Sequence, residues 1–305
     1  MTRPAVVGVD LGGTKAVAAL VHPDGSTSPV HRRPSPGPDA EPGAVDELLD
    51  ELVRAAAGGL PDAVGIGAAG FVDSDGSRVR FAPHLPWRDD PVGSRLRSRW
   101  GVPVALDNDA NCAAVAESTL GAARGASSAV LLTVGTGIGG ALVLDGRVLR
   151  GHRGMAGEFG HVQVVPEGRH CPCGLRGCLE QYVSGPALLR QARTAGLGVE
   201  VAPDSPAVTD LALAGDPLAL EALAVLGRRL GVALAGLVAA FDPEVLVVGG
   251  GVMAAGDLLL DPARTALAEH LVGAGHRDVP AVRAAATGPD AGLVGAGLLA
   301  RRLLP

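Results

Sequence analysis

The sequence has few aromatic side chains and no excess of positive charge. Of its 305 residues, four are Phe, two are Trp and one is Tyr, and the formal net charge at pH 7 is -6. Proteins that bind nucleic acids use basic patches and aromatic platforms on which bases stack. We therefore expect no nucleic-acid partner for this chain.

Long apolar runs and export signals are also scarce. The longest apolar stretch, residues 230–241, is shorter than the roughly 20 residues that a helix needs to cross a bilayer. The apolar residues 5–9 lack the basic flank and the cleavage site of a secretory signal. A hydrophobic fraction of 47% argues against extensive disorder. We expect a globular, cytoplasmic protein with no membrane partner.

Lysine is almost absent, because Lys15 is the only lysine among the 26 basic residues. It ends a short motif, residues 10–15, between apolar segments 5–11 and 16–22 that are typical of buried strands. Paired glycines let backbone N–H groups approach a phosphate, a Thr hydroxyl adds a donor, and a strand-end carboxylate can hold a metal ion through water. A plain hairpin turn, in a composition that favours arginine, would explain the same residues.

A similar turn follows in the middle of the chain. Two apolar segments, residues 129–134 and 139–144, flank Gly135, Thr136 and Gly137. Two such openings, each followed by alternating strands and helices, indicate an α/β protein with two related halves, which we divide near residues 121–128. Two facing turns would clamp a phosphate chain. Neither matches the Walker or the dinucleotide-binding pattern, which disfavours those enzyme classes.

A polar cluster, residues 107–111, lies where a strand is expected to end and a helix to begin. Asp and Asn are preferred helix caps, so capping alone would explain the cluster. The cluster also suits a general base, Asp109, with the Asn108 amide beside it to orient a hydroxylated substrate. The two interpretations are compatible.

A histidine and three cysteines form the most specific motif, and a tetrahedral, structural zinc site suits this set of four ligands. A disulfide is the main alternative, but residues 171 and 173 are poorly placed to bond each other and no export is expected. Cys112 is expected to be a small buried side chain rather than a nucleophile. The four predicted metal ligands are His161, Cys171, Cys173 and Cys178.

Together these motifs resemble the ROK family, which comprises bacterial glucokinases, other sugar kinases and sugar-responsive repressors, and they are most similar to its actinobacterial ATP-dependent glucokinases. The resemblance implies an α/β, two-domain hexokinase/actin-like (ribonuclease H-like) ATPase fold with an interdomain cleft. It implies a smaller domain of residues 1–120 plus 289–305 and a larger domain of residues 121–288 that carries the zinc loop. The implied activity is phosphorylation of glucose at its 6-hydroxyl by ATP with Mg²⁺.

The resemblance also implies a role for each motif residue. Asp109 would be the general base, with Mg²⁺ held in part by Asp10. The sugar-binding residues would be Asn108, Asp109, Glu158, His161 and Glu180. The nucleotide-binding residues would be Asp10, Gly12, Gly13, Thr14, Lys15, Gly135, Thr136, Gly137, Gly249 and Gly250.

Two departures from the family pattern leave the sugar preference open. His84 stands where family glucokinases usually carry Asn, and Ala69 replaces a frequent Pro. Alternatives are a kinase for fructose, mannose or an N-acetylated amino sugar, polyphosphate as donor, a sugar-binding regulator, and a non-catalytic zinc-stabilised protein. The family's repressors carry a DNA-binding domain ahead of the phosphate turn, for which the residues before Asp10 leave no room. The resemblance suggests a homo-oligomer, either a dimer or a tetramer.

Overall fold

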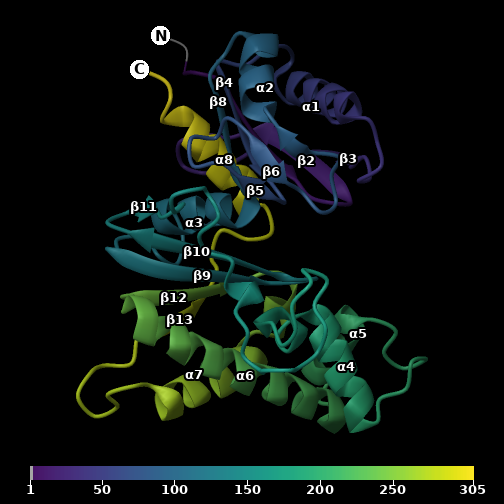
Figure 1. Ribbon diagram of the computed structural model, residues 1–305, viewed down its shortest axis with the longest axis vertical. Coiled ribbons are helices and arrows are strands. Elements are labelled where there is room, and N and C mark those ends of the chain that lie inside the picture. Colours follow the sequence, from purple (N-terminus) through teal and green to yellow (C-terminus); the bar gives the residue numbers. More distant parts are fainter. Residues whose placement is uncertain (1–2) are drawn as a thin grey trace. The chain divides into compact units, whose positions relative to one another are not determined.

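The computed structural model describes residues 3–305 and divides into two compact units (Figure 1). The first unit comprises Met1–Gly125, Leu142–Gly157 and Ala286–Pro305, and the second comprises Ala126–Ala141 and Glu158–Ala285. Residues 1–2, where the predicted smaller domain begins, lie outside the described residues. The units differ from the predicted domains chiefly at residues 142–157, and the predicted domain limits stay a prediction.

A five-stranded sheet forms the centre of the first unit, with the order β3-β2-β1-β4-β8. β1 pairs with β2 in antiparallel fashion, whereas β1, β4 and β8 are parallel to one another. All six residues of β4 are buried, as expected for a strand covered on both faces. The strands are β1 (Val6–Leu11), β2 (Lys15–Leu20), β3 (His31–Pro34), β4 (Ala63–Ala68) and β8 (Val104–Asn108).

Helices cover both faces of this sheet (Figure 1). Val7 and Val9 of β1 share an apolar core with Leu49 of α1 (Pro42–Ala57). Gly8 points the other way, because successive residues of a strand face opposite sides, and it meets α8 (Ala291–Arg301). α8 in turn packs against α3 (Asp109–Thr119).

Glycines let α8 lie directly on its neighbours. A Cβ atom at Gly65 would lie 1.8 Å from the Ala296 carbonyl oxygen. A Cβ atom at Gly295 would lie 1.7 Å from the Cys112 carbonyl oxygen. Both distances are far below any van der Waals contact, so these positions require glycine for close packing.

A second, three-stranded sheet in the first unit has the order β5-β6-β7. Its short strands were not expected from the sequence, since each spans only two or three residues. The elements are β5 (Phe71–Val72), β6 (Val79–Phe81) and β7 (Arg88–Asp90), followed by α2 (Val92–Trp100).

The other five-stranded sheet has the order β11-β10-β9-β12-β13, in which β9, β12 and β13 are parallel to one another. When the strands of each large sheet are renumbered by their order along the chain, both sheets have the third strand at one edge, followed by the second, first, fourth and fifth. This shared order confirms the prediction of two related halves. The strands are β9 (Ser128–Val134), β10 (Ile138–Leu144), β11 (Arg147–Val148), β12 (Val245–Gly249) and β13 (Ala281–Ala284). The associated helices are η1 (Phe159–His161), η2 (Leu179–Gln181), α4 (Gly185–Ala195), α5 (Ser205–Leu213), α6 (Pro217–Phe241), η3 (Gly251–Ala255) and α7 (Asp257–His270).

Helix α6 is long and apolar enough to cross a membrane, judged by length and composition only. The apolar run of residues 230–241 is only the second half of this helix, which begins at Pro217, after the Asp216 side chain caps its first turn. Half of its most apolar window is buried, and it packs against α4, α5 and α7. Leu223, Leu226 and Leu230 are fully buried, so α6 has the character of a core helix.

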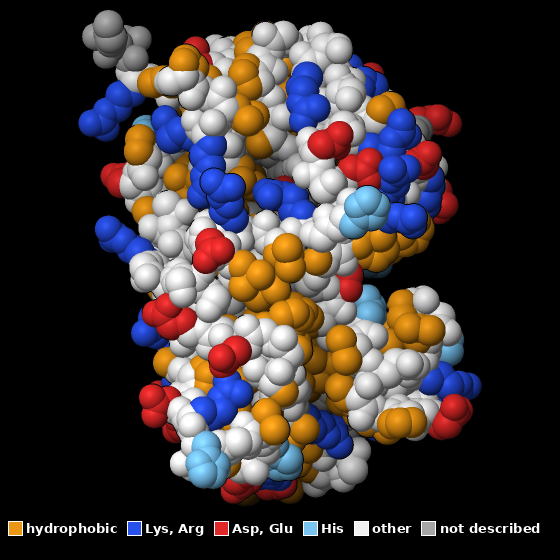
Figure 2. Space-filling view, turned by 60° about the vertical axis from the view of Figure 1, so that its left-hand side comes forward, with side chains coloured by type: hydrophobic (Ala, Val, Ile, Leu, Met, Phe, Trp, Pro, Cys, Tyr) orange, Lys and Arg blue, Asp and Glu red, His pale blue; other side chains and the backbone are white. Residues whose placement is uncertain are grey.

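Charged side chains of both signs share the surface. On the face shown in Figure 2, basic side chains (blue) and acidic side chains (red) are interspersed. Some of the protein's charged side chains pair, as Arg80 does with Asp73 and Asp89. Exposed pairs of this kind contribute little to stability but keep the surface hydrated.

Candidate functional site

The polar motifs of the first unit lie at one edge of its sheet. β1, β4 and β8 are parallel, so the residues that follow them emerge at the same end. These are the glycine turn after β1, Gly70 after β4, and Asn108 and Asp109 at the end of β8. Ligands of open α/β sheets bind at the carboxyl ends of the strands. The structure therefore gathers the sequence-predicted groups of this unit at the edge where chemistry is expected.

The turn after β1 is a tight hairpin held by its own backbone. The Gly12 N–H donates to the Lys15 carbonyl over 3.0 Å, while Thr14 and Lys15 are exposed. A Cβ atom at Gly13 would lie 2.4 Å from the Cβ of His84. His84, the residue that departs from the family pattern, thus lies directly against the predicted phosphate turn.

Asp10 lies at the end of β1 in surroundings that disfavour its charge. Burial, with the nearby carboxylates of Asp109 and Asp290, raises the pKa of Asp10 to about 7, although Lys15 opposes the shift. Its carboxylate lies against the first turn of α8, where a Cβ atom at Gly292 would come within 3.3 Å of Oδ2. The positive charge of Lys15 does not fully compensate the negative charges around Asp10, so this carboxylate is suited to hold a cation.

Asn108 and Asp109 have different roles at the start of α3. The Asn108 side chain caps the helix, accepting from the N–H groups of Ala110 and Asn111 over 2.9 and 3.2 Å, and its Nδ2 donates to the Gly70 carbonyl. The capping interpretation is therefore right for Asn108. Asp109 follows the cap, and loss of hydration raises the pKa of its carboxyl group. Its Oδ1 accepts an N–H bond of the helix backbone, from Ala110 over 2.8 Å, and a carboxylate in this position can serve as a base.

Asp107 is a further polar residue of this edge to which the sequence assigned no role of its own. It is buried, and its carboxylate accepts from the Asn108 N–H, from Asn111 Nδ2 and from Arg150 Nε, each over 2.8 Å. This network fixes the backbone immediately before Asp109. Arg150 is 43 residues away, so no local pattern indicates the pair.

Cys112 lies one turn further along α3 and is fully buried. Burial raises the pKa of its thiol well above the ordinary value. Its sulfur packs on β4, where a Cβ atom at Gly67 would be 3.2 Å away. The expectation of a packing role rather than a nucleophilic one agrees with this environment.

In the second unit, the two predicted nucleotide-binding turns follow neighbouring parallel strands, β9 and β12. Gly135 accepts from the Gly185 N–H over 2.7 Å and donates to Gly137 over 2.9 Å, while Thr136 is exposed. Gly250 has a positive φ of 89°, and a Cβ atom there would lie 2.4 Å from the Val134 carbonyl oxygen. The end of β12 can approach β9 this closely only because residue 250 is glycine.

Glu180 contacts the phosphate turn of the same unit. Its Oε2 accepts from the Ile138 N–H over 2.9 Å, and a Cβ atom at Gly137 would lie 2.4 Å from that oxygen. The carboxylate predicted to bind sugar is therefore also the group that holds the turn in place.

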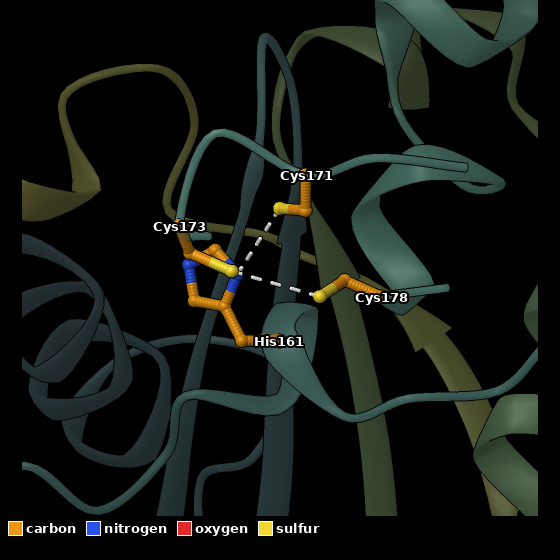
Figure 3. A group of neighbouring side chains, drawn as sticks. All are labelled: His161, Cys171, Cys173 and Cys178. Carbon is orange, nitrogen blue, oxygen red and sulfur yellow. Dashed lines mark hydrogen bonds between the residues drawn. The ribbon is translucent and has the colours of Figure 1, made fainter. Parts of the chain in front are cut away.

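The four predicted metal ligands lie together (Figure 3), and their candidate ligand atoms are all within 4.8 Å of one another. His161 Nδ1 is 3.8 Å from Cys171 Sγ, and Cys173 Sγ is 3.7 Å from Cys178 Sγ. Zinc–sulfur bonds of about 2.3 Å in a tetrahedron place ligand atoms about 3.7 Å apart. The donor set and its spacing fit zinc. The presence of zinc itself stays a prediction.

Without a metal, the thiols of this cluster compete for charge. Burial opposes ionisation of Cys173, but hydrogen bonds from the Leu175 backbone and from the other two thiols lower its pKa. Burial and the neighbouring Cys173 raise the pKa of Cys178 to about 12. A divalent cation would stabilise all three thiolates at once.

The two nitrogens of His161 face different partners. Nδ1 faces Cys171, whereas Nε2 lies 4.0 Å from Glu158 Oε2. A ligand histidine commonly directs its second nitrogen to a carboxylate, which fixes the ring. The predicted metal-binding and sugar-binding roles of His161 are therefore chemically compatible, because each uses a different atom.

Comparison with known proteins shows which proteins the chain is similar to. The chain is 40% identical to a glucokinase of Streptomyces coelicolor over 310 residues, covering 97% of each chain. A crystal structure of a ROK family glucokinase from Streptomyces griseus in complex with glucose and AMPPNP matches with a TM-score of 0.86 and 38% identity, covering 98% of this chain and 99% of that one. A ROK family transcriptional regulator, a homologue of the E. coli MLC protein, matches with a TM-score of 0.87 and 28% identity, covering 98% and 78%.

The family assignment extends along nearly the whole chain. The model of the ROK family matches residues 6–303, which include every predicted site residue. The match and the solved structures confirm both the predicted fold class and the resemblance drawn from the motifs. This protein belongs to the ROK family.

Proposed function

We propose that this protein is an ATP-dependent glucokinase, which transfers the γ-phosphoryl group of ATP to the 6-hydroxyl of glucose. Relatives named glucokinase match nearly its full length, and a similar structure holds glucose and AMPPNP. The chain is a sugar kinase. The observation that carries the proposed chemistry is Asp109, a carboxylate with a raised pKa at the start of α3, whose Oδ1 accepts from the Ala110 N–H over 2.8 Å.

Asp109 acts as the general base in this proposal. As the sugar O6 forms its bond to the γ-phosphorus, the bond from that phosphorus to the β,γ-bridging oxygen breaks, and the O6 proton passes to the Asp109 carboxylate. Asn108 and the Asp107 network hold the backbone that carries this carboxylate. Phosphoryl transfer depends mainly on positioning, so a rigid base contributes through its placement.

In this proposal the glycine turns bind the phosphates of ATP through backbone N–H groups other than those of Gly12 and Gly135, which donate within their own turns. Gly12, Gly13 and Thr14 belong to the first unit, and Gly135, Thr136 and Gly137 to the second. Mg²⁺, when bound with the nucleotide, would neutralise charge that develops on the phosphates. Asp10 is the residue that suits a role in holding it, because its charge lacks full compensation.

The sugar hydroxyls are assigned to Asn108, Glu158, His161 and Glu180. Three of these lie in the second unit. Zinc bound with Cys171, Cys173 and Cys178 would hold His161 at Nδ1 and would leave Nε2 to a hydroxyl or to Glu158. Zinc in this proposal is structural, since four protein ligands leave no open position.

The proposal also covers the cellular location and the oligomeric state of the protein. A cytoplasmic location is supported by the four cysteines of the described chain, none of which forms a disulfide. A homodimer or homotetramer is supported by exposed apolar side chains such as Val162, Val164 and Leu175.

A coupled assay of ADP release tests the proposed function. MgATP is supplied with glucose, mannose, fructose, glucosamine, N-acetylglucosamine or N-acetylmannosamine in turn, and Asp109→Asn serves as the catalytic control. We expect a clear preference for glucose and a loss of at least about 100-fold in kcat for the variant. A preference for another sugar would contradict the glucokinase assignment.

Two further arms separate the remaining alternatives. Inorganic polyphosphate in place of ATP tests the donor, and binding of glucose without turnover on any sugar would favour a sugar-binding regulator. The variant His84→Asn tests specificity, because it keeps the Cβ that packs on Gly13 and changes only the group beyond it. We expect it to change KM for glucose more than kcat.

A further inference from the structure

The first unit contains a cavity of about 330 Å³ to which none of the roles above applies. The described residues that line it include none assigned to sugar, nucleotide or zinc. Its apolar side is formed by the buried Val104, Leu106, Val115 and Val148, from β8, α3 and β11. The loop of residues 74–76, the C-terminal part of α8 and four arginines complete the lining.

The charged groups of this cavity are predominantly basic. Four arginines and two aspartates, Asp75 and Asp107, line it, which leaves a surplus of two positive charges in a protein whose overall charge is -6. The arginines are Arg97, Arg147, Arg150 and Arg302. A local surplus of this sign attracts anions.

Two of the arginines are engaged and two are not. Arg150 pairs with Asp107, and Arg97 donates to the carbonyls of Val104 and Gly76 over 3.0 Å each. Arg147 and Arg302 are exposed, and neither takes part in an ion pair within the described part of the chain. Their guanidinium groups are therefore free to bind a ligand from solvent.

We propose that this cavity binds a small organic phosphate monoester. The planar guanidinium group matches a phosphate dianion with paired hydrogen bonds, so Arg147 and Arg302 suit the phosphate. The volume exceeds that of inorganic phosphate and falls at the lower end of small-ligand sites. The apolar wall of Val104, Leu106 and Val148 would contact the carbon skeleton of the ester.

The cavity is connected to the proposed catalytic base through Asp107. Arg150 lines the cavity and holds the Asp107 carboxylate, which also accepts from the N–H of Asn108 and from Asn111 Nδ2. A phosphate that draws Arg150 away would leave the Asp107 carboxylate with only Asn108 and Asn111 as partners. A ligand in the cavity would therefore change the hydrogen bonds of Asp107, which holds the Asn108 backbone immediately before Asp109.

Calorimetric titration with glycerol 3-phosphate, in the presence of saturating glucose and AMPPNP to fill the proposed active site, tests the binding. We expect saturable binding, weakened at least about tenfold in Arg147→Gln/Arg302→Gln. The control Arg99→Gln/Arg124→Gln removes the same charge from exposed positions outside the cavity lining and should bind like the wild type. Equal loss in both double variants, or no saturable binding in the wild type, would overturn the site.

Inorganic phosphate distinguishes the two sources of this chemistry. Weaker binding of inorganic phosphate than of glycerol 3-phosphate supports an organic ester, and equal binding overturns that class.

Kinetics test the connection to the base. At constant ionic strength, glycerol 3-phosphate should change KM for glucose in the wild type and not in Arg147→Gln/Arg302→Gln. An unchanged KM would overturn the connection. The titration needs no turnover and is repeated without glucose and AMPPNP, so it detects binding in the cavity even if the protein does not phosphorylate glucose, whereas the kinetic test rests on the proposed function.

Discussion

At the scale of single residues, Asp109 combines a catalytic position with an unfavourable environment for its charge. Because loss of hydration raises its pKa, the base becomes active only above the pH range of an ordinary aspartate. We expect kcat/KM for glucose to fall on acidification with a midpoint above about 4. Rates measured from about pH 4 to pH 8, together with unfolding curves at each pH, check this.

Asp10 is the control for that profile. The pKa of Asp10 is about 7, so protonation of Asp10 would also lower kcat/KM at acidic pH. The pH dependence of the rate that remains in Asp10→Asn distinguishes the two carboxyl groups. The fall in kcat/KM that belongs to Asp109 should persist in this variant. A profile that becomes flat would assign the fall to Asp10 instead.

The same shift makes a prediction about stability. A carboxyl group whose pKa is raised by folding stabilises the folded state below its unfolded pKa, and this contribution is lost as pH rises through the folded pKa. Wild-type protein therefore bears a penalty for the Asp109 carboxylate at pH 8 that it does not bear near pH 4, and Asp109→Asn removes this penalty. We expect the variant to unfold at a higher temperature at pH 8 and to converge with the wild type near pH 4 in thermal unfolding.

An exposed carboxylate provides the comparison. Asp39→Asn makes the same chemical change at an exposed position of the first unit. Its unfolding temperature should stay close to that of the wild type at both pH values. An Asp109→Asn variant that is no more stable than Asp39→Asn at pH 8 would contradict the cost assigned to the base.

At the scale of elements, the contact between α3 and α8 depends on the absence of a side chain at Gly295. A Cβ there would lie 1.7 Å from the Cys112 carbonyl oxygen, so Gly295→Ala must push the helices apart. We expect a loss of about 1–3 kcal/mol in the free energy of unfolding, measured by urea denaturation. Gly236→Ala in α6 is the control, since no atom lies within 4 Å of its Cβ. It should be neutral or stabilise by up to about 1 kcal/mol, and equal effects of the two substitutions would contradict the packing argument.

The sequence predicted the elements whose periodicity or turn chemistry is local. The apolar segments 5–11, 16–22, 129–134 and 139–144 correspond to β1, β2, β9 and β10, and the glycine turns and the metal ligands were found from short motifs. The strands β5, β6, β7 and β13 were missed, because two to four residues carry no period.

Contacts between distant segments were also beyond the sequence. Glu117 is buried, and its carboxylate accepts from the N–H groups of Ala286 and Thr287, 169 and 170 residues away, which ties α3 to the segment that leads into α8. The Asp107–Arg150 pair is of the same kind. Such buried pairings are specified by the packed fold, and no local pattern of residue types indicates them.

At the scale of the whole molecule, the metal cluster belongs to one compact unit only. All four ligands lie in Glu158–Ala285, where they connect η1 to the loop that precedes η2. A metal that binds the folded loop stabilises it by mass action, and a divalent cation would also relieve the competition among three thiols. Removal of zinc should therefore weaken the second unit and leave the first largely unchanged.

Chelation and Cys173→Ser test this uneven dependence on the metal. We expect loss of stoichiometric zinc by elemental analysis and a fall of about 5 °C or more in the unfolding temperature. Hydrogen exchange should quicken around residues 158–183 and stay unchanged in β1 and β4. Cys112→Ser, which alters a buried cysteine of the first unit, should retain full zinc content. Unchanged metal content in Cys173→Ser would contradict the four-ligand site, and faster exchange throughout both units would show that the metal stabilises the whole molecule rather than one part of it.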